Sequence, residues 1–263
     1  MRERRPTQRF DVEVDGANDD KRLNRVRKTI TKKKTKAAKK PTKPMHFTYF
    51  DVMAKGLGPM ICLSVAEVPH RGDFCGPKDS GGVNWKTLKP TTPFGQLPLL
   101  QDGDLVVAQT TAICNYIGHK CNMLGANSDH DFAISSMLLA ETEDIYSSSQ
   151  QKCPTIYVKL DDPKKQGLEG YQRWATEEIP SHLDRLEQLL KAEDTLGFTE
   201  SGKTVGELYF FAMLHQLVLV LPDVLATRPS LNTFYRATLA RPRVKKVLDG
   251  EGAFPMRQYF VAP

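Results

Sequence analysis

The sequence has no run of about 18 apolar residues, and it therefore predicts no transmembrane helix. The longest apolar stretch, 208–221, contains His215 and Gln216, which is typical of a buried helix. Cysteine is also scarce, because the 263 residues contain five and no Cys-x-x-Cys spacing. So few cysteines cannot form a dense disulfide framework, which favours a reducing, cytoplasmic compartment. The His and Cys residues form no four-ligand pattern, and we expect no metal.

Acidic and aromatic residues are sparse in residues 1–44, which contain 16 of the 37 Lys and Arg but only 6 of the 31 Asp and Glu. The net charge of this segment is about +10, whereas that of the remaining chain is about −4. Its low apolar content cannot offset the entropy lost on ordering, so we expect a disordered basic extension. It lacks the apolar core of a secretory signal, and five acids within 11–20 disfavour a transit peptide. A solvated or cleaved leader and a nuclear-localisation or nucleic-acid-binding patch both stay open.

Residues 45–121 alternate between strand and helix patterns. A period of two predicts a strand at 46–50 and another at 68–74, and the apolar residues between them predict a helix. We expect a long loop over 75–92, followed by a hairpin and a further helix. This order is typical of a thioredoxin-like α/β domain.

The pattern changes at a polar linker, 122–129, after which no strand pattern returns. Candidate helices lie at about 130–150, 168–192, 204–221, 230–240 and 243–249. The predicted architecture is therefore an α/β domain at 45–121 followed by an all-α domain at 130–263.

A hairpin is predicted between strands at 97–101 and 105–108. The turn begins at Asp102-Gly103, because glycine adopts a positive φ at no steric cost. A helix then starts at Thr110. Proline is unusual at the entry of a paired strand, and a cis bond between Leu97 and Pro98 would explain it. Such a bond would turn the backbone groups of Leu97 toward a peptide-like ligand.

The residues of this hairpin match a known signature. The run Phe94-Gly-Gln-Leu-Pro98, followed by Asp102-Gly-Asp104 and Gln109-Thr-Thr-Ala-Ile113, resembles the glutathione-binding signature of the glutathione transferases. The resemblance extends over 45–263, and among the classes of this family the sequence is similar to the sigma class. It implies a homodimer that conjugates the glutathione thiolate to small electrophiles in detoxification, or a glutathione-dependent isomerase.

Glutathione chemistry requires a group that favours the thiolate, because the thiolate is the nucleophile. Lowering the thiol pKa from about 8.5 by about two units takes about 2.7 kcal/mol. The resemblance identifies Tyr49, at the end of the first strand, as the hydroxyl donor to the sulfur. Lys55 stands where the family carries a supporting Arg, and its compact charge lacks the planar guanidinium fork. A buried core tyrosine is the alternative interpretation of Tyr49.

The resemblance also implies which residues bind glutathione. Gln109 and Thr110 would hold the γ-glutamyl end, since a helix N-terminus receives a carboxylate. The backbone of Leu97, before Pro98, would pair with the cysteinyl unit. The remaining candidates are Gln96, Trp85 and Lys89 for the glycine end, and Asp144 or Glu141 for the amine of glutathione bound to a partner subunit. Packing or solvated-surface roles are the alternatives for Trp85, Lys89 and the acids.

A second motif lies at 197–204, where Gly-Phe-Thr-Glu-Ser-Gly-Lys-Thr matches the phosphate-loop pattern of nucleotide-binding proteins. That loop requires a preceding β-strand, whereas the apolar residues of 183–190 have helical spacing. The same residues also form a predicted capping box, with Thr204 at the N-cap and Glu207 three residues later. We therefore interpret this segment as a helix start.

An alternative function is that of a non-catalytic docking subunit in a larger assembly. The fold also serves as a docking module in large assemblies, and the basic extension would bind an acidic partner such as RNA. The altered turn at 51–58 favours this alternative, whereas Tyr49 and the Gln109-Thr110 pair favour the enzyme.

Overall fold

The computed structural model describes residues 43–76, 81–125, 128–193 and 196–263. The predicted basic extension lies outside these ranges apart from its last two residues, which are exposed.

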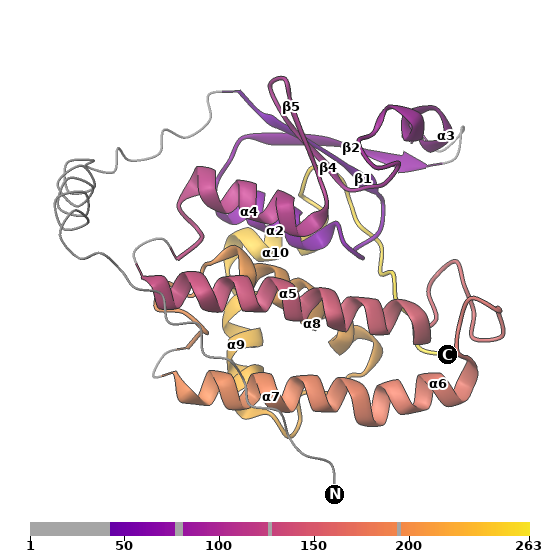
Figure 1. The fold of residues 1–263 in the computed structure, drawn as a ribbon, viewed down its shortest axis with the longest axis vertical. Helices are drawn as coiled ribbons and strands as arrows, with labels where there is room; N and C mark the ends of the chain where they lie inside the picture. Colours follow the sequence, from indigo (N-terminus) through magenta and orange to yellow (C-terminus); the bar gives the residue numbers. More distant parts are fainter. Residues whose placement is uncertain (1–42, 77–80, 126–127, 194–195) are drawn as a thin grey trace, which may run out of the picture. The chain divides into compact units, whose positions relative to one another are not determined.

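A five-stranded mixed sheet forms the first part of the fold (Figure 1). Its strands are β1 (Met45–Phe50), β2 (His70–Gly76), β3 (Val83–Asn84), β4 (Leu99–Asp102) and β5 (Leu105–Ala108), in the order β3-β2-β1-β4-β5. The central strand β1 pairs parallel with β2 and antiparallel with β4. Its side chains alternate in burial, and Met45, Phe47 and Tyr49 point into the core. The predicted thioredoxin-like arrangement is therefore confirmed.

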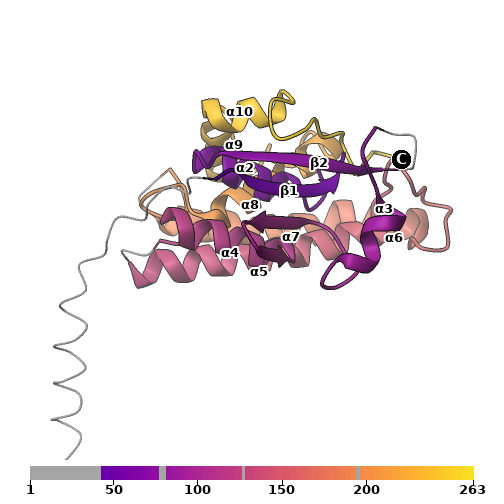
Figure 2. The same ribbon diagram turned by 90° about the horizontal axis from the view of Figure 1, so that it is seen from above.

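Two helices cover one face of the sheet. They are α2 (Leu57–Val65) and α4 (Thr110–Cys121), which lie beneath the sheet in Figure 1. In Figure 2, α2 lies between α4 and the last helix, α10 (Pro242–Leu248). Because α2 has neighbours on all sides, eight of its nine residues are buried.

The prediction of a long loop at 75–92 is wrong in its second half. After β3, the chain forms a short helix α3 (Trp85–Leu88), and the 3₁₀ turn η1 (Lys89–Thr91) follows directly. The Asn84 side chain accepts a hydrogen bond from the backbone N–H of Lys86, so a local N-cap starts this helix without any apolar periodicity. The predicted hairpin and the cis Leu97–Pro98 bond are confirmed, with Gly103 at a φ of +62°.

The second part is helical, as predicted. Its helices are α5 (Asp129–Lys152), α6 (Gly167–Arg173), a π-helical turn η2 (Trp174–Glu178), α7 (Ile179–Ala192), α8 (Val205–Val220), α9 (Pro229–Leu239) and α10. Helix α8 is apolar around almost its whole circumference, and it packs against both α5 and α2. It therefore joins the two parts of the core. No helix within the described ranges is long and apolar enough to cross a membrane.

The C-terminal segment, 253–263, returns across the end of the sheet (Figure 1). The backbone of Arg257 exchanges hydrogen bonds with Asp51 and Met53, just after β1. Further along, the Tyr259 carbonyl accepts from Ile156, which follows α5. This C-terminal segment thus ties the end of β1 to the end of α5.

Candidate functional site

Tyr49 lies near the end of the central strand, with only 6% of its surface exposed. Its hydroxyl accepts a hydrogen bond from the backbone N–H of Lys55 at 3.2 Å. The ring packs directly on Gly56, where a Cβ atom would lie 2.2 Å from a ring carbon. Glycine at 56 is therefore required for the turn after β1 to close over the tyrosine.

The surroundings of Tyr49 keep its hydroxyl protonated. Burial raises the pKa of this phenol, and the hydrogen bond from the Lys55 N–H opposes the rise without cancelling it. The nearby Tyr259, Glu143 and Tyr157 side chains raise the pKa further. Since the oxygen already accepts from Lys55, the phenolic proton is free to be donated to a ligand.

The Lys55 side chain extends from the turn after β1 toward α5. Its ammonium forms an ion pair with Glu143 on α5 and lies 4.7 Å from the centre of the Tyr146 ring. Glu143 also accepts a 2.5 Å hydrogen bond from the Tyr209 hydroxyl on α8. The backbone N–H of Lys55 therefore donates to Tyr49, while its ammonium forms an ion pair with Glu143.

Sequence interpretation considered Glu141 and Asp144 but overlooked Glu143. A signal was present, because Glu143 lies between Leu139 and Tyr146 on the buried side of α5. A carboxylate in such a stripe requires a partner. Glu141 is paired with His182 at 2.6 Å, whereas Asp144 is exposed.

The sheet register aligns three of the predicted positions. Thr48 pairs with Leu99 and Leu99 with Ala108, so the next residues in line are Tyr49, Pro98 and Gln109. Adjacent strands lie about 4.8 Å apart, and this row therefore spans about 10 Å, the length of an extended tripeptide. The row runs from buried Tyr49 to exposed Gln109, just before α4.

The start of α4 has polar groups available for a ligand. Thr110 is only 3% exposed, yet its hydroxyl has no hydrogen-bond partner within the described ranges. Gln109 has a φ of +72°, and its amide donates to the Gln96 side chain at 3.1 Å. Both glutamines are exposed. The free N–H groups of the first turn add a partial positive charge beside Thr110.

Trp85 and Lys89 lie on the short helical segment before this region. Trp85 is half-buried and contacts Phe50 edge-on, with ring centres 5.7 Å apart. Lys89 is exposed, and a Cβ atom added at Gly95, just before Gln96, would lie 3.6 Å from its side chain. The structure thus brings Lys89 close to the Gln96 segment, and it brings Trp85 to the other side of β1.

A pocket of about 890 Å³ opens on that other side of Tyr49. Aromatic rings from five segments line it: Phe50, Phe74, Trp85, Tyr157 and Tyr259. The guanidinium of Arg257 closes one edge, donating to Asp51 at 2.9 Å and to the Tyr157 hydroxyl at 3.1 Å. The thiol of Cys75 lies in the wall, and burial and the Asp73 charge raise its pKa to about 11. The pocket therefore suits an apolar, flat ligand.

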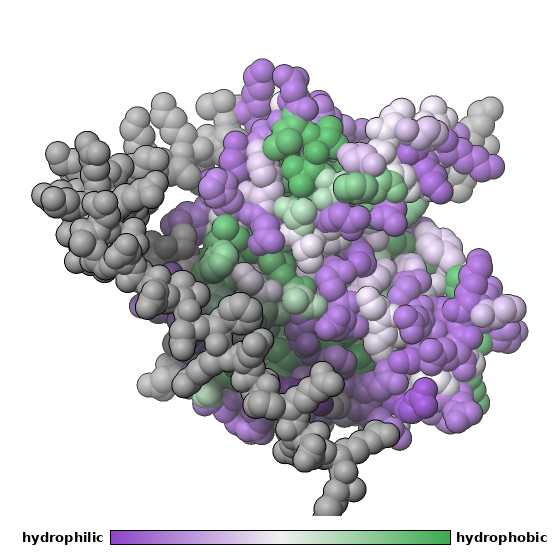
Figure 3. All heavy atoms as spheres, in the orientation of Figure 1, coloured by the Kyte–Doolittle hydropathy of each residue, from purple (hydrophilic) through white to green (hydrophobic). Residues whose placement is uncertain are grey.

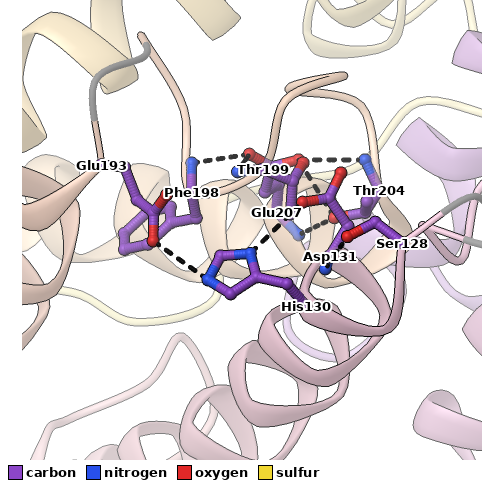
Figure 4. A network of polar contacts seen from close by, with 8 residues as sticks. All are labelled: Ser128, His130, Asp131, Glu193, Phe198, Thr199, Thr204 and Glu207. Carbon is purple, nitrogen blue, oxygen red and sulfur yellow. Dashed lines mark hydrogen bonds and ion pairs between the residues drawn. The ribbon is translucent and has the colours of Figure 1, made fainter.

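The segment 197–204 contains no open phosphate cradle. As Figure 4 shows, its donors converge on the carboxylate of Glu207. The backbone N–H groups of Phe198, Thr199 and Thr204 donate at 2.8, 3.1 and 3.0 Å, and the two threonine hydroxyls add further bonds. The predicted capping box is confirmed, and α7 rather than a strand precedes the segment. The N–H groups of Phe198, Thr199 and Thr204 are therefore already occupied by a carboxylate of the same chain.

Comparison with protein families identifies both parts of the chain. Residues 45–119 match the sequence model of "Glutathione S-transferase, N-terminal domain", and residues 149–251 match that of "Glutathione S-transferase, C-terminal domain". Together the two matches cover about two thirds of the chain.

Individual proteins agree with these matches. The chain is 25% identical over 199 residues to glutathione S-transferase 1 of Ascaris suum, covering 76% of this chain and 92% of that protein. It is 26% identical over 168 residues to glutathione S-transferase 2 of Manduca sexta, covering 63% and 78%.

Solved structures share the fold. A glutathione S-transferase from Ascaris lumbricoides aligns with a TM-score of 0.66 at 23% identity, covering 82% of this chain and 100% of that one. Prostaglandin synthase D of Nilaparvata lugens aligns with a TM-score of 0.65 at 22% identity, covering 79% and 98%. From the two domain matches, these relatives and the shared fold, the chain belongs to the glutathione S-transferase family.

Proposed function

We propose that this glutathione transferase activates the thiol of glutathione with the hydroxyl of Tyr49. The observation that carries the proposal is the state of that hydroxyl, which is buried, protonated and already accepting the Lys55 N–H. Its O–H group can therefore donate a hydrogen bond to the sulfur of glutathione once that sulfur is a thiolate. The thiol releases its proton to water, the thiolate attacks the electrophile, a carbon–sulfur bond forms, and the leaving group departs with its electron pair. Where the thiolate adds to an activated double bond instead, the resulting carbanion takes a proton from water.

The row of positions beside Tyr49 supports a binding mode for the tripeptide. The γ-glutamyl carboxylate would meet the Thr110 hydroxyl and the α4 N-terminus, with Gln109 beside it. The backbone of Leu97, before Pro98, would pair with the cysteinyl unit. The glycine end would meet Gln96, Lys89 and Trp85.

The electrophile would occupy the aromatic pocket on the other side of Tyr49, between the proposed domains at 45–121 and 130–263. Rings line this pocket, so a flat apolar electrophile fits it best. A sigma-like subclass, including a glutathione-dependent isomerase, is a variant that the similarity to prostaglandin synthase D of Nilaparvata lugens supports.

We also propose that the protein forms a homodimer through the face of α5 and the β4–β5 hairpin. Figure 3 shows an apolar patch over this hairpin, where Leu105 and Val106 are 48% and 43% exposed. The exposed side of α5 carries small and apolar residues, including Met137 at 53%. Asp144 continues the exposed side of α5, and it would reach the amine of glutathione bound to a second copy.

Two further proposals concern the whole chain. No disulfide joins the five cysteines, all of which lie within the described ranges, and this supports a reducing compartment such as the cytoplasm. The charge of residues 1–44 supports an acidic partner, and salt-sensitive binding of RNA that is lost on deleting 1–44 would test it.

The test of the catalytic proposal is the pH dependence of the thiolate. Ultraviolet difference spectra of glutathione bound to the full chain should show a thiol pKa about two units below the free value. In Tyr49→Phe the pKa should return toward the free value, and conjugation to an aryl halide at neutral pH should fall about 100-fold. Failure to bind millimolar glutathione would overturn the proposal and favour the non-catalytic docking alternative.

A further inference from the structure

The peptide unit that joins Ala54 to Lys55 is held at both of its ends. Its N–H group, from Lys55, donates to the Tyr49 hydroxyl at 3.2 Å. Its carbonyl group, from Ala54, accepts a 3.1 Å hydrogen bond from the side-chain amide of Gln216 on α8. Because both groups belong to one planar unit, the bond at the carbonyl end also fixes the direction of the N–H group. Gln216 is thus connected to Tyr49 through a single peptide.

The backbone at Ala54 requires outside contacts to keep this direction. Ala54 has a φ of +25°, which residues with a side chain rarely adopt. Such a conformation persists only where the surrounding structure imposes it. Ala54 is 4% exposed, so water cannot replace the partner of its carbonyl unless the turn opens. The bond from Gln216 is therefore one of the contacts that hold the turn after β1 in its strained form.

The surroundings of Gln216 fix the orientation of its amide. The side chain is 1% exposed, and its nitrogen also donates to the carbonyl of Ala212, one turn earlier on α8. Two carbonyl acceptors require the nitrogen of the amide, rather than its oxygen, on this side. The amide oxygen has no hydrogen-bond partner among the described residues, which costs stability that an apolar residue would not lose. What the amide contributes in return is the bond to Ala54.

We propose that Gln216 is a positioning residue for the conjugation reaction, which acts on the glutathione sulfur through the Ala54–Lys55 peptide and Tyr49. The inference rests on the proposed function, because it concerns the Tyr49 hydroxyl as the donor to that sulfur. An N–H group that donates to a hydroxyl oxygen polarises the O–H bond, and the hydroxyl becomes a stronger donor. Gln216 is uncharged, so replacing it leaves the ionisable groups around Tyr49 in place: Lys55, Glu143, Tyr146, Tyr157 and Tyr259.

The experiment replaces Gln216 in the full chain and measures the thiol pKa of bound glutathione. Gln216→Met removes the amide and keeps a flexible side chain of similar length. It should raise the thiol pKa by about 0.5 units, a quarter of the shift expected for Tyr49→Phe. Conjugation should fall about threefold well below that pKa and match wild type above it, where the thiol ionises without help. In a Tyr49→Phe background the same change should shift the pKa by less than about 0.1 units, because its effect passes through Tyr49.

Ser135→Ala is the matched control for loss of a buried hydrogen bond to α8. The Ser135 hydroxyl accepts from the Gly206 N–H at 3.1 Å, and Gly206 precedes Gln216 on α8 by about 15 Å. The control should lower the melting temperature, as Gln216→Met does, and leave the thiol pKa unchanged. Gln216→Asn, whose amide is one methylene shorter, replaces Gln216→Met if that variant does not fold, and it should shift the pKa in the same direction.

A second measurement requires no glutathione. Hydrogen exchange of the Lys55 amide, followed by NMR, should be about tenfold faster in Gln216→Met than in wild type, and unchanged in Ser135→Ala. Unchanged Lys55 exchange, or a conjugation rate lowered equally at every pH, would overturn this inference and leave the proposed function standing. If the wild type does not lower the thiol pKa of glutathione, the proposed function fails, and this inference fails with it.

Discussion

Two segments of this chain match ligand-binding patterns, and the structure uses their donors differently. At 93–113 the hydroxyl of Thr110, at the start of α4, is buried without a partner within the described ranges. At 197–204, before α8, the backbone N–H groups of Phe198, Thr199 and Thr204 are directed at Glu207 instead. A pattern of donors therefore indicates a site only where the folded chain leaves those donors unused.

The start of α9 is a third example of the occupied kind. The backbone N–H groups of Ser230 and Leu231 donate to Glu187 on α7 at 3.1 and 2.8 Å. A carboxylate of the same chain binds these N–H groups without the translational entropy cost that a dissolved anion pays on binding. N–H groups at the starts of α8 and α9 are thus bound by carboxylates of the same chain, Glu207 and Glu187. At the start of α4 the Thr110 hydroxyl has no such partner within the described ranges.

The largest effect is expected from removing the carboxylate that fills the α8 start. Glu207→Ala leaves three backbone donors and two hydroxyls buried without an acceptor, which should destabilise the fold by about 3 kcal/mol or more. Urea unfolding measures this loss. Glu200→Ala, an exposed acid in the same segment, is the control and should change stability by less than about 0.5 kcal/mol. Similar stability of the two variants would show that the Glu207 contacts are not structural.

A matched pair of threonines sharpens the comparison further. Thr110→Val should weaken glutathione binding about tenfold and leave stability nearly unchanged, because the lost hydroxyl has no partner among the residues that the structure describes. Thr204→Val should do the reverse, costing about 1 kcal/mol of stability through the lost N-cap. Calorimetric titration and thermal unfolding of both variants measure the two quantities. Equal effects of the two variants on binding would break the distinction.

Glu187 should make the α9 start sensitive to acid. Burial acts to raise the pKa of this carboxyl, but the N–H groups of Leu231 and Ser230 outweigh it and lower the pKa below its usual value. A lowered folded-state pKa stabilises the protein above the unfolded-state value of about 4.3, and this contribution is lost as the pH falls through the folded-state pKa. Glu187→Gln should therefore cost about 1 kcal/mol at pH 7, and less below about pH 4. A pH-independent difference in urea unfolding would contradict this.

The smallest effects are expected from two exposed lysines, one in each segment. Lys89→Ala should weaken glutathione binding a few-fold, since a solvated ammonium contributes little to an ion pair. Lys203→Ala, at the lysine of the phosphate-loop pattern, should change neither glutathione binding nor ATP binding. Fluorescence titration with each ligand measures both. Detectable ATP binding by the wild type that Lys203→Ala removes would overturn the interpretation of 197–204.

Local signals accounted for most of the fold. Gly103 in the hairpin, Pro98 before β4, and the pairing of Thr204 with Glu207 each act over a few residues, and each is where the sequence placed it. The stretch 75–92 was misread because a single N-cap, Asn84, starts a helix too short to show periodicity. Sequence patterns thus fail where one hydrogen bond, rather than a repeated face, decides the structure.

The candidate site could be predicted from the sequence only along β1, β4 and the start of α4. The hairpin fixed the register that brings Tyr49, Pro98 and Gln109 into one row. The aromatic pocket was not accessible, because Tyr157, Arg257 and Tyr259 reach it from segments that no local pattern connects to β1. Glu143 was visible only as a charge on a buried stripe, and its partners Lys55 and Tyr209 come from 88 and 66 residues away.

The C-terminal segment indicates when the pocket forms during folding. Arg257 meets Asp51 across 206 residues of chain, and this is among the longest closures in the fold. Long closures cost more entropy and form late, after the local helices and the hairpin. The wall that completes the pocket beside Tyr49 is therefore expected to be the last part to assemble when the chain folds, and the first to open when it begins to unfold.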